Sequence, residues 1–149
     1  MSYTVSLDEK DMKILKILAK NARIPYSEIA KIVELSDVAV IKRVRKLEQS
    51  GIIKGYTLIV DPKKLGFNSI SITGIDVEPE HLFDVIERLR NMENIKYIAL
   101  TTGDHSIIVT VWARNGEEMA KIHDMISKIP GVKRVCPAII LDVFKDERV

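Results

Sequence analysis

The sequence predicts an α+β chain of two small domains, a three-helix domain followed by a βαββαβ domain. Apolar residues at helical spacing fill the first third of the chain, and the second half contains an internal repeat with a period of about 37 residues. The two halves also differ in charge. Residues 1–64 contain 13 Lys and Arg against 8 Asp and Glu, whereas residues 65–149 contain 10 against 13. Because attraction of a polyanion depends on local charge, the basic half and the acidic half are expected to have different partners.

The first predicted helix begins after Ser6. Ser6 and Glu9 have the spacing of a capping box, in which each side chain accepts a hydrogen bond from the other residue's backbone N–H. Pro25 cannot continue a helix, so this one is expected to end between residues 21 and 24. Four apolar residues should share its buried face: Leu7, Ile14, Leu15 and Leu18.

The second predicted helix runs from Pro25 to Val33, because proline is suited to the first turn of a helix. Ile29 and Ala30 should be buried. A break of about three residues then leads to Ser36, a good N-cap for a third helix that runs to about Ser50, before Gly51. Two short helices joined by so tight a turn predict a helix-turn-helix. The third helix should pack on the other two through Val40, Val44 and Leu47.

A second face of the third helix is expected to bind DNA. Ala39, Lys42, Arg43 and Lys46 recur at i, i+3, i+4 and i+7. Arg and Lys donate to guanine edges or phosphates, and small side chains at the helix start allow close approach to the major groove. A solvated basic surface is the alternative interpretation. The predicted DNA-binding residues are Ser36, Asp37, Val38, Ala39, Lys42, Arg43, Arg45 and Lys46.

Residues 52–60 are rich in β-branched and aromatic residues and are interrupted by Gly55, which predicts an extended arm. Asp61 and Pro62 predict a turn. The expected organisation is therefore a helix-turn-helix domain with its arm at residues 1–60, a hinge at 61–67 and a second domain at 68–149.

The internal repeat predicts the second domain. Each copy reads as an alternating strand, an amphipathic helix and a second strand, which gives the ferredoxin-like βαββαβ arrangement. Its helices cover one face of an antiparallel sheet, so the other face requires a partner, and a homodimer through the sheet is expected. The ungapped alignment pairs Ile70 with Ile107, Ile72 with Val109, Val85 with Ile122, Leu89 with Ile126 and Ile98 with Val135.

We find no motif of a common enzyme or cofactor site, and we predict no catalytic residue, no metal ligand and no cofactor. His81, His105 and His123 are too far apart in sequence to act as local metal ligands. Cys136, the single cysteine, cannot form a disulfide within the chain and is interpreted as a small core or interface residue. A single cysteine agrees with a reducing compartment, and we find neither a signal peptide nor a membrane-spanning stretch. We therefore expect a cytoplasmic protein without a membrane partner.

A polar turn separates the two copies of the repeat. Hairpin geometry alone would explain its Gly and Asp, and a ligand-binding loop is the second interpretation. The residues concerned are Thr101, Thr102, Gly103, Asp104, His105 and Ser106.

Taken in order, these motifs resemble the Lrp/AsnC family, the feast/famine regulators of bacteria and archaea. The resemblance implies a winged-type helix-turn-helix, a ferredoxin-like ligand-sensing domain, and dimers that assemble into tetramers or octamers. It also implies an amino-acid effector, held near the loop between the second and third strands where dimers meet. The residues that carry it are Leu7-Asp8, Asp11, Ile14-Leu15, Ile29-Ala30, Leu35-Ser36, Val40, Arg43-Val44, Leu47-Glu48, Gly51-Ile52-Ile53, Gly55-Tyr56, Asp61-Pro62 and Leu65-Gly66.

The chain departs from the family pattern at the ligand loop. The family's Thr-Gly-x-x-Asp ends here in Ser106, and a usual Thr-x-Thr in the last strand is Val135-Cys136-Pro137. Asp104 lies close enough in sequence to replace the missing carboxylate.

The expected function is a sequence-specific DNA-binding transcription regulator, not an enzyme, that binds an approximate palindrome of double-stranded DNA. Two alternatives stay open. One is an enzyme resembling siroheme decarboxylases, which share this fold and need histidines facing a haem. The other is an amino-acid-binding module without DNA function, which would leave Lys42, Arg43 and Lys46 unexplained.

Overall fold

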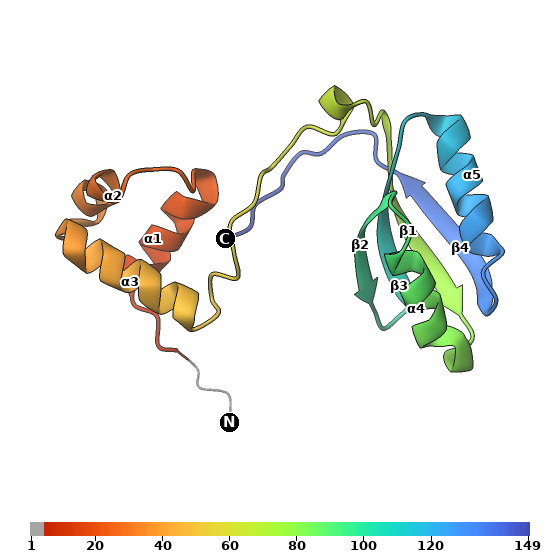
Figure 1. Ribbon diagram of the computed structural model, residues 1–149, viewed down its shortest axis with the longest axis horizontal. Helices are drawn as coiled ribbons and strands as arrows, with labels where there is room; N and C mark the ends of the chain where they lie inside the picture. The colour runs from red at the N-terminus through yellow and green to blue at the C-terminus, as the bar shows by residue number, and fades with distance from the viewer. Residues whose placement is uncertain (1–4) are drawn as a thin grey trace. The chain divides into compact units, whose positions relative to one another are not determined.

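The computed structural model describes residues 5–149, so the first four residues of the predicted helix-turn-helix domain lie outside the described residues. The chain divides into two compact units (Figure 1). One comprises Met1–Ile59 with Lys145–Val149, and the other comprises Val60–Phe144. The predicted hinge, residues 61–67, falls in the second of these units.

The first unit contains α1 (Glu9–Lys20), α2 (Tyr26–Val33) and α3 (Asp37–Gln49). As predicted, α2 and α3 are joined by a short turn and form a helix-turn-helix. Their shared core consists of fully or almost fully buried side chains from all three helices: Ile14, Leu15, Leu18, Ile29, Ala30, Val33, Val40, Val44 and Leu47. The predicted core of this unit is therefore confirmed, with the exception of Leu7.

The start of α1 differs from the prediction. Asp8 is the N-cap, its carboxylate accepting from the Asp11 backbone N–H at 2.8 Å while the Asp8 N–H donates to the Asp11 carboxylate at 3.1 Å. The predicted Ser6–Glu9 box is wrong because this aspartate pair closes a reciprocal box two residues later, and Asp is as good an N-cap as Ser. Leu7 consequently precedes the helix and is 36% exposed.

The predicted ends of the other two helices agree with the structure. Pro25 is the N-cap of α2, and the Ser36 hydroxyl accepts from the Ala39 N–H at 3.1 Å at the start of α3. Gly51 follows α3 with a φ of +76°, a left-handed conformation that favours glycine. Residues 52–60, the predicted arm, are assigned to no helix or strand within the described chain.

The second unit contains β1 (Ser69–Val77), α4 (Leu82–Arg90), β2 (Ile95–Leu100), β3 (Ile107–Ala113), α5 (Gly116–Ser127) and β4 (Val132–Ile139). All strand pairs are antiparallel in the order β2-β3-β1-β4. This order and the βαββαβ succession confirm the predicted ferredoxin-like arrangement.

The predicted repeat is right for the elements but one residue out of register in the first strand. Val85 and Leu89 of α4 correspond to Ile122 and Ile126 of α5, all buried. Ile72, however, is 47% exposed, whereas Val109, its partner in the ungapped alignment, is fully buried. Because strand side chains alternate, a shift of one residue exchanges the two faces. A shift one residue shorter instead places buried Ser71, Thr73, Ile75 and Val77 on buried Ile107, Val109, Val111 and Ala113.

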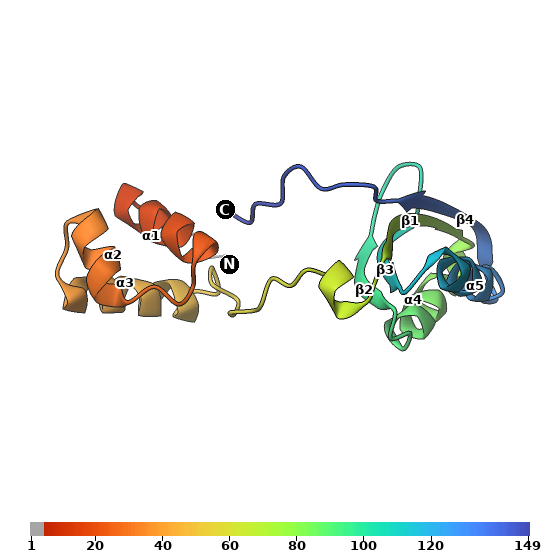
Figure 2. The same cartoon turned by 90° about the horizontal axis from the view of Figure 1, so that it is seen from above.

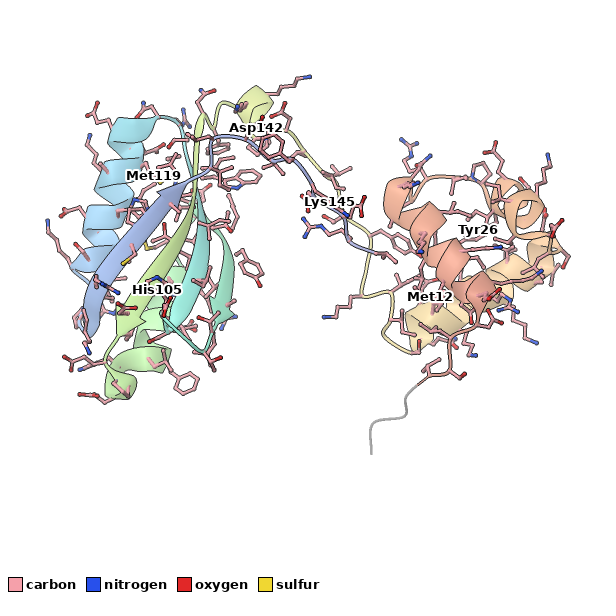
Figure 3. All side chains as sticks on the ribbon, turned by 180° about the vertical axis from the view of Figure 1, so that it is seen from behind. Met12, Tyr26, His105, Met119, Asp142 and Lys145 are labelled. Atoms are coloured by element: carbon pink, nitrogen blue, oxygen red, sulfur yellow. The ribbon has the colours of Figure 1, made fainter. Side chains whose placement is uncertain are left out.

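Helices α4 and α5 both cover one face of the sheet (Figure 2), and the core of this unit lies between them and the strands. Met119 of α5, 3% exposed, is part of this core (Figure 3). Two polar side chains of β1, Ser71 and Thr73, are also fully buried here, and the Thr73 hydroxyl lies 2.8 Å from His123 Nε2 of α5.

Apart from the Asp76–Arg134 ion pair at one end, the opposite sheet face is mostly apolar, and it is covered by no helix of this unit. Cross-strand pairing places Ile72 opposite Thr110 and Ala138, and Ile70 opposite Trp112, on that face. Ile72 and Tyr97 are 47% and 58% exposed. The prediction of a sheet face that the domain's own helices leave uncovered is therefore confirmed for the described residues of this unit.

Candidate DNA-binding surface and ligand pocket

The surface of α3 that points away from the core is basic. Lys42, Arg45 and Lys46 are exposed, while Val40, Val44 and Leu47 on the opposite side are at most 1% exposed. At the start of the helix, Ser36, Asp37 and Val38 are exposed, and Ala39 is half-buried. The spacing of α3 therefore separates a core face from a face on which Lys and Arg are available to a ligand.

Arg43 differs from its neighbours. Its Nη1 atom donates to Asp8 Oδ2 at 2.7 Å and to Asp11 Oδ1 at 2.8 Å, and its side chain is 29% exposed. The pKa of Asp8 falls from 3.8 to about 2, first because the Asp11 N–H stabilises the carboxylate and then because Arg43 does. The same two carboxylates raise the pKa of Arg43.

The Arg43 ion pairs join α3 to the capping box of α1. Helical spacing within α3 could not reveal them, because the partners lie 32 and 35 residues earlier. The signal that was available is the pair Asp8 and Asp11, two carboxylates on one turn that need cationic or N–H donors. Arg43 thus fixes the position of α3 against α1 in the unliganded unit.

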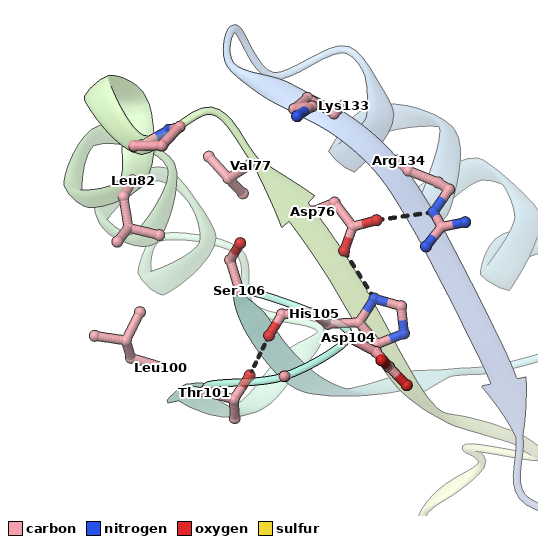
Figure 4. Close-up of a pocket in the computed structure, with 12 residues that line it drawn as sticks. Asp76, Val77, Leu82, Leu100, Thr101, Asp104, His105, Ser106, Lys133 and Arg134 are labelled. Atoms are coloured by element: carbon pink, nitrogen blue, oxygen red, sulfur yellow. Dashed lines mark hydrogen bonds and ion pairs between the residues drawn. The ribbon is translucent and has the colours of Figure 1, made fainter.

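The second unit contains a pocket of about 610 Å³ at the end of β1. Figure 4 shows its walls, which come from β1, the start of α4, the loop between β2 and β3, and β4. Five of the six predicted effector residues line it, namely Thr101, Gly103, Asp104, His105 and Ser106; Thr102 does not. Sequence reasoning missed the other lining residues: Asp76, Val77, Pro79, Leu82, Leu100, Lys133 and Arg134.

The loop that lines the pocket is held by its own backbone. Thr101 N–H donates to the Ser106 carbonyl at 2.9 Å, the Thr101 hydroxyl donates to the His105 carbonyl at 2.7 Å, and Ser106 N–H donates to the Ile75 carbonyl at 3.2 Å. Gly103 has a φ of +108°, so the turn itself requires glycine. The backbone conformation of the turn therefore requires glycine at position 103, independently of the place of Gly103 in the pocket wall.

Asp76 is the centre of a charged network in the pocket wall. Its carboxylate lies 2.8 Å from His105 Nδ1 and accepts from Arg134 Nε at 2.8 Å. The hydrogen bond from His105 and then that from Arg134 lower the pKa of Asp76. The network becomes possible through the β1–β4 register, which pairs Asp76 with Arg134.

The pocket combines both signs of charge with an apolar wall. Asp76 and Asp104 supply carboxylates, and Lys133 and Arg134 supply cations. The apolar side comes from Val77, Leu82 and Leu100. Such a set is suited to a small zwitterion with an apolar side chain, because each charge of the ligand finds an opposite charge.

A helix-turn-helix with a basic outer face, followed by an α+β domain with a polar pocket, defines a DNA-binding regulator with a ligand-sensing domain. Residues 7–48 match the AsnC-type helix-turn-helix domain and residues 70–149 the Lrp/AsnC ligand binding domain. The chain belongs to the Lrp/AsnC family of transcriptional regulators. No helix among residues 5–149 is long and apolar enough to cross a membrane.

Known relatives agree with this assignment. The chain is 51% identical over 140 residues to the HTH-type transcriptional regulator LrpA of Pyrococcus horikoshii, covering 93% of this chain and 99% of that protein. It is 37% identical over 142 residues to the regulator FL11 of Pyrococcus abyssi, with 95% and 94% covered.

Among solved structures, E. coli AsnC superposes with a TM-score of 0.87 at 27% identity, covering 97% of this chain and 98% of that one. A feast or famine regulatory protein from M. tuberculosis, solved in complex with L-methionine, gives a TM-score of 0.87 at 28% identity and the same coverage.

Proposed function

We propose that this regulator binds an approximate palindrome of double-stranded DNA as a homodimer, that an amino acid modulates its assembly, and that it is not an enzyme. The observation that carries the DNA-binding part is the exposed basic face of α3, which belongs to a helix-turn-helix and lies opposite the helix's own core face. The second helix of such a motif is the one that enters the major groove. The regulator names of the relatives support the same interpretation.

Within α3 we divide the predicted residues by role. Lys42, Arg45 and Lys46 are proposed to contact bases or phosphates, and Ser36, Asp37, Val38 and Ala39 to bring the helix start close to the groove. Arg43 is proposed to act mainly by holding α3 in place, because its Nη1 atom already binds Asp8 and Asp11.

The homodimer is proposed to form through the uncovered sheet face. Large exposed side chains on that face, such as Ile72 and Tyr97, favour burial against a second copy. A two-fold dimer presents two identical α3 helices, so the DNA site should be an inverted repeat with half-sites about 34 Å or a multiple apart. Assembly of such dimers into tetramers or octamers is the further expectation from the family.

An amino acid is the proposed effector. The pocket offers Asp104 for an ammonium group and Lys133 for a carboxylate, beside the apolar Leu82 and Leu100. The L-methionine complex of the M. tuberculosis relative supports this class of ligand. Ser106 stands where the family loop has a carboxylate, so the identity of the amino acid is left to the experiment.

The DNA-binding proposal is tested by selecting bound genomic fragments and measuring affinity for the best one. Lys42→Ala with Lys46→Ala should weaken binding, by roughly 1–3 kcal/mol for each lysine that hydrogen-bonds a base. Each lysine that instead neutralises a phosphate should lower the salt slope by about 0.9 when it is replaced. Lys121→Ala, which removes an exposed lysine from α5, is the matched control and should change neither. Unchanged affinity in the α3 double variant would refute the assignment of this surface. A purified protein with a Soret absorbance band would instead support a haem enzyme.

A further inference from the structure

Asp76, His105 and Cys136 form a cluster, and two of its members, Asp76 and His105, also line the pocket proposed for the effector. One ligand-type atom from each residue lies within 4.8 Å of the other two. The three residues are far apart in sequence and come from β1, the loop before β3, and β4. We propose that these three side chains bind one Zn²⁺ ion per chain, with a fourth coordination position left open.

The register of the sheet brings the three groups together. In the β1–β4 ladder, Gly74 pairs with Cys136 and Asp76 with Arg134, so the Asp76 and Cys136 side chains lie on the same sheet face. This is the face that no helix of this unit covers. The Asp76 and His105 side chains are only 23% and 25% exposed, and Cys136 is half-buried. The three side chains are therefore partly buried, and Asp76 and His105 face the pocket.

Gly74 makes room for the imidazole between the other two ligands. A Cβ atom built on Gly74 would lie 2.2 Å from His105 Cδ2 and 2.4 Å from Cγ, distances at which the ring must move. Only glycine allows the His105 ring to lie against β1 at this point. Thr101 donates hydrogen bonds to the carbonyls of His105 and Ser106, and the Ser106 N–H donates to a carbonyl of β1. These bonds hold the loop backbone around His105 and limit the movement of its side chain.

The donor set selects the ion. A thiolate, an imidazole nitrogen and a carboxylate oxygen suit Zn²⁺, whereas Mg²⁺ and Ca²⁺ prefer oxygen alone. Ligand atoms around a tetrahedral Zn²⁺ lie roughly 3.3–3.8 Å apart, so His105 Nδ1 and Asp76 Oδ1, which are 2.8 Å apart, must separate by about half an ångström to bind one ion. The hydrogen bond between His105 Nδ1 and Asp76 Oδ1 is replaced when both atoms bind the ion.

Arg134 is the expected outer partner of the site. Its Nε atom donates to Asp76 Oδ2 at 2.8 Å and so orients the carboxylate while Asp76 Oδ1 is used for the metal. The ion carries two positive charges, and the carboxylate and the thiolate balance them. The site as a whole therefore retains the single positive charge of Arg134, which the adjoining pocket already accommodates.

The experiment uses the untagged full-length protein, stripped with a chelator and reloaded with Co²⁺ and then with Zn²⁺. Co²⁺ should give a thiolate-to-cobalt charge-transfer band with a stoichiometry of one per chain, and Zn²⁺ should displace it. Cys136→Ser should abolish the band, and His105→Gln should weaken Zn²⁺ binding at least about tenfold, since loss of an outer partner alone typically costs about 10–100-fold. Melting curves of the metal-free variants establish that they fold.

His81→Gln is the matched control, because it removes an imidazole from a second carboxylate-containing cluster formed with Glu78 and Glu80. Retention of the cobalt band and of Zn²⁺ affinity in this variant, together with their loss in Cys136→Ser and His105→Gln, supports the proposed site. Metal binding that is lost in His81→Gln and kept in the other two overturns it, and so does the absence of any Co²⁺ band in the wild-type protein.

Discussion

Asp11 in the first unit and Asp76 in the second each accept a hydrogen bond of 2.8 Å from an arginine, but the two carboxylates lie in different surroundings. The side chain of Asp11 is 5% exposed and that of its partner Arg43 is 29% exposed. Asp76 is 23% exposed and its partner Arg134 is 64% exposed. A closed ion pair fixes the packing of two helices, whereas an open one is free to exchange its partners for those of a ligand. Similar residues thus join two helices in one unit and line the candidate pocket in the other.

The largest effect is expected when the closed pair is broken. Arg43→Ala leaves the buried Asp11 carboxylate without its cation and should destabilise the first unit by about 1–3 kcal/mol. Urea unfolding followed by helix circular dichroism measures this. Lys42→Ala, one residue earlier on the exposed face, should change stability by less than about 0.5 kcal/mol. Equal stability of the two variants would show that the Arg43 pairs contribute nothing to the fold.

Acidification should destabilise the two units in different pH ranges. Burial lowers the pKa of His123 below its usual 6.5, so the unfolded state takes up the proton first and the second unit loses stability as the pH falls below about 6.5. The pKa of Asp8 is about 2 instead of 3.8, so its contribution to the first unit is present above pH 3.8 and is lost only as the pH falls toward 2.

Fluorescence of Trp112, the single tryptophan and part of β3, reports on the second unit, whereas helix circular dichroism reports on both units, with the larger share of helical residues in the first. Urea midpoints measured between pH 7 and pH 3 should therefore decline first in the fluorescence signal. His123→Gln should remove that early decline. Coincident losses in both signals throughout this range would contradict the separation.

A smaller effect on stability is expected when the hydrogen bond between His105 and Asp76 in the second unit is broken. Gly74→Ala forces the His105 ring away from β1 and should break its hydrogen bond to Asp76. Because this cluster is partly exposed, we expect a smaller shift of the urea midpoint than in Arg43→Ala, together with a changed amino-acid response. A nuclear magnetic resonance titration of His105 measures whether its environment has changed. An unaltered His105 resonance would show that the ring tolerates the methyl group.

The smallest effect on DNA binding is expected from Asp104→Asn. This change removes a pocket charge without touching α3, so affinity for one isolated palindrome should stay within about twofold of wild type, a difference below about 0.5 kcal/mol. The effector response or the size of the assembly, measured by sedimentation with and without amino acid, should change. Loss of binding to the isolated palindrome by a folded dimer would contradict the separation of roles.

The parts of the fold that follow from neighbouring residues could be predicted from the sequence. Ser36 and Gly51 mark the two ends of α3 because caps act within one turn, and Val40, Val44 and Leu47 define its buried face by spacing alone. The start of α1 could not be decided in this way, because Ser6 with Glu9 and Asp8 with Asp11 offer overlapping boxes. In the structure the Asp8–Asp11 box is the one that forms, and Arg43, more than 30 residues away in sequence, binds both of its carboxylates.

The pocket could be predicted only in part from the sequence, because the folding of the chain brings its charged residues together from distant positions. Composition identifies the polar loop 101–106, but Asp76 and Arg134 come together only through the β1–β4 ladder. The one-residue error in the repeat had a related cause. Apolar residues of both face types occur in β1 and β3, so pattern alone could not set the strand register.

The two connections within the repeat differ in length and in their part in the pocket wall. Between β1 and α4 the chain makes a 3-10 turn at Pro79–His81, and Pro79 and Leu82 there form part of the pocket wall. Between β3 and α5 the connection is shorter, and Asn115 caps α5 directly. The pocket is thus built at the first of these connections and is completed by Lys133 and Arg134 of β4 in the second copy. One effector molecule in this pocket of each subunit would saturate a two-fold dimer at two.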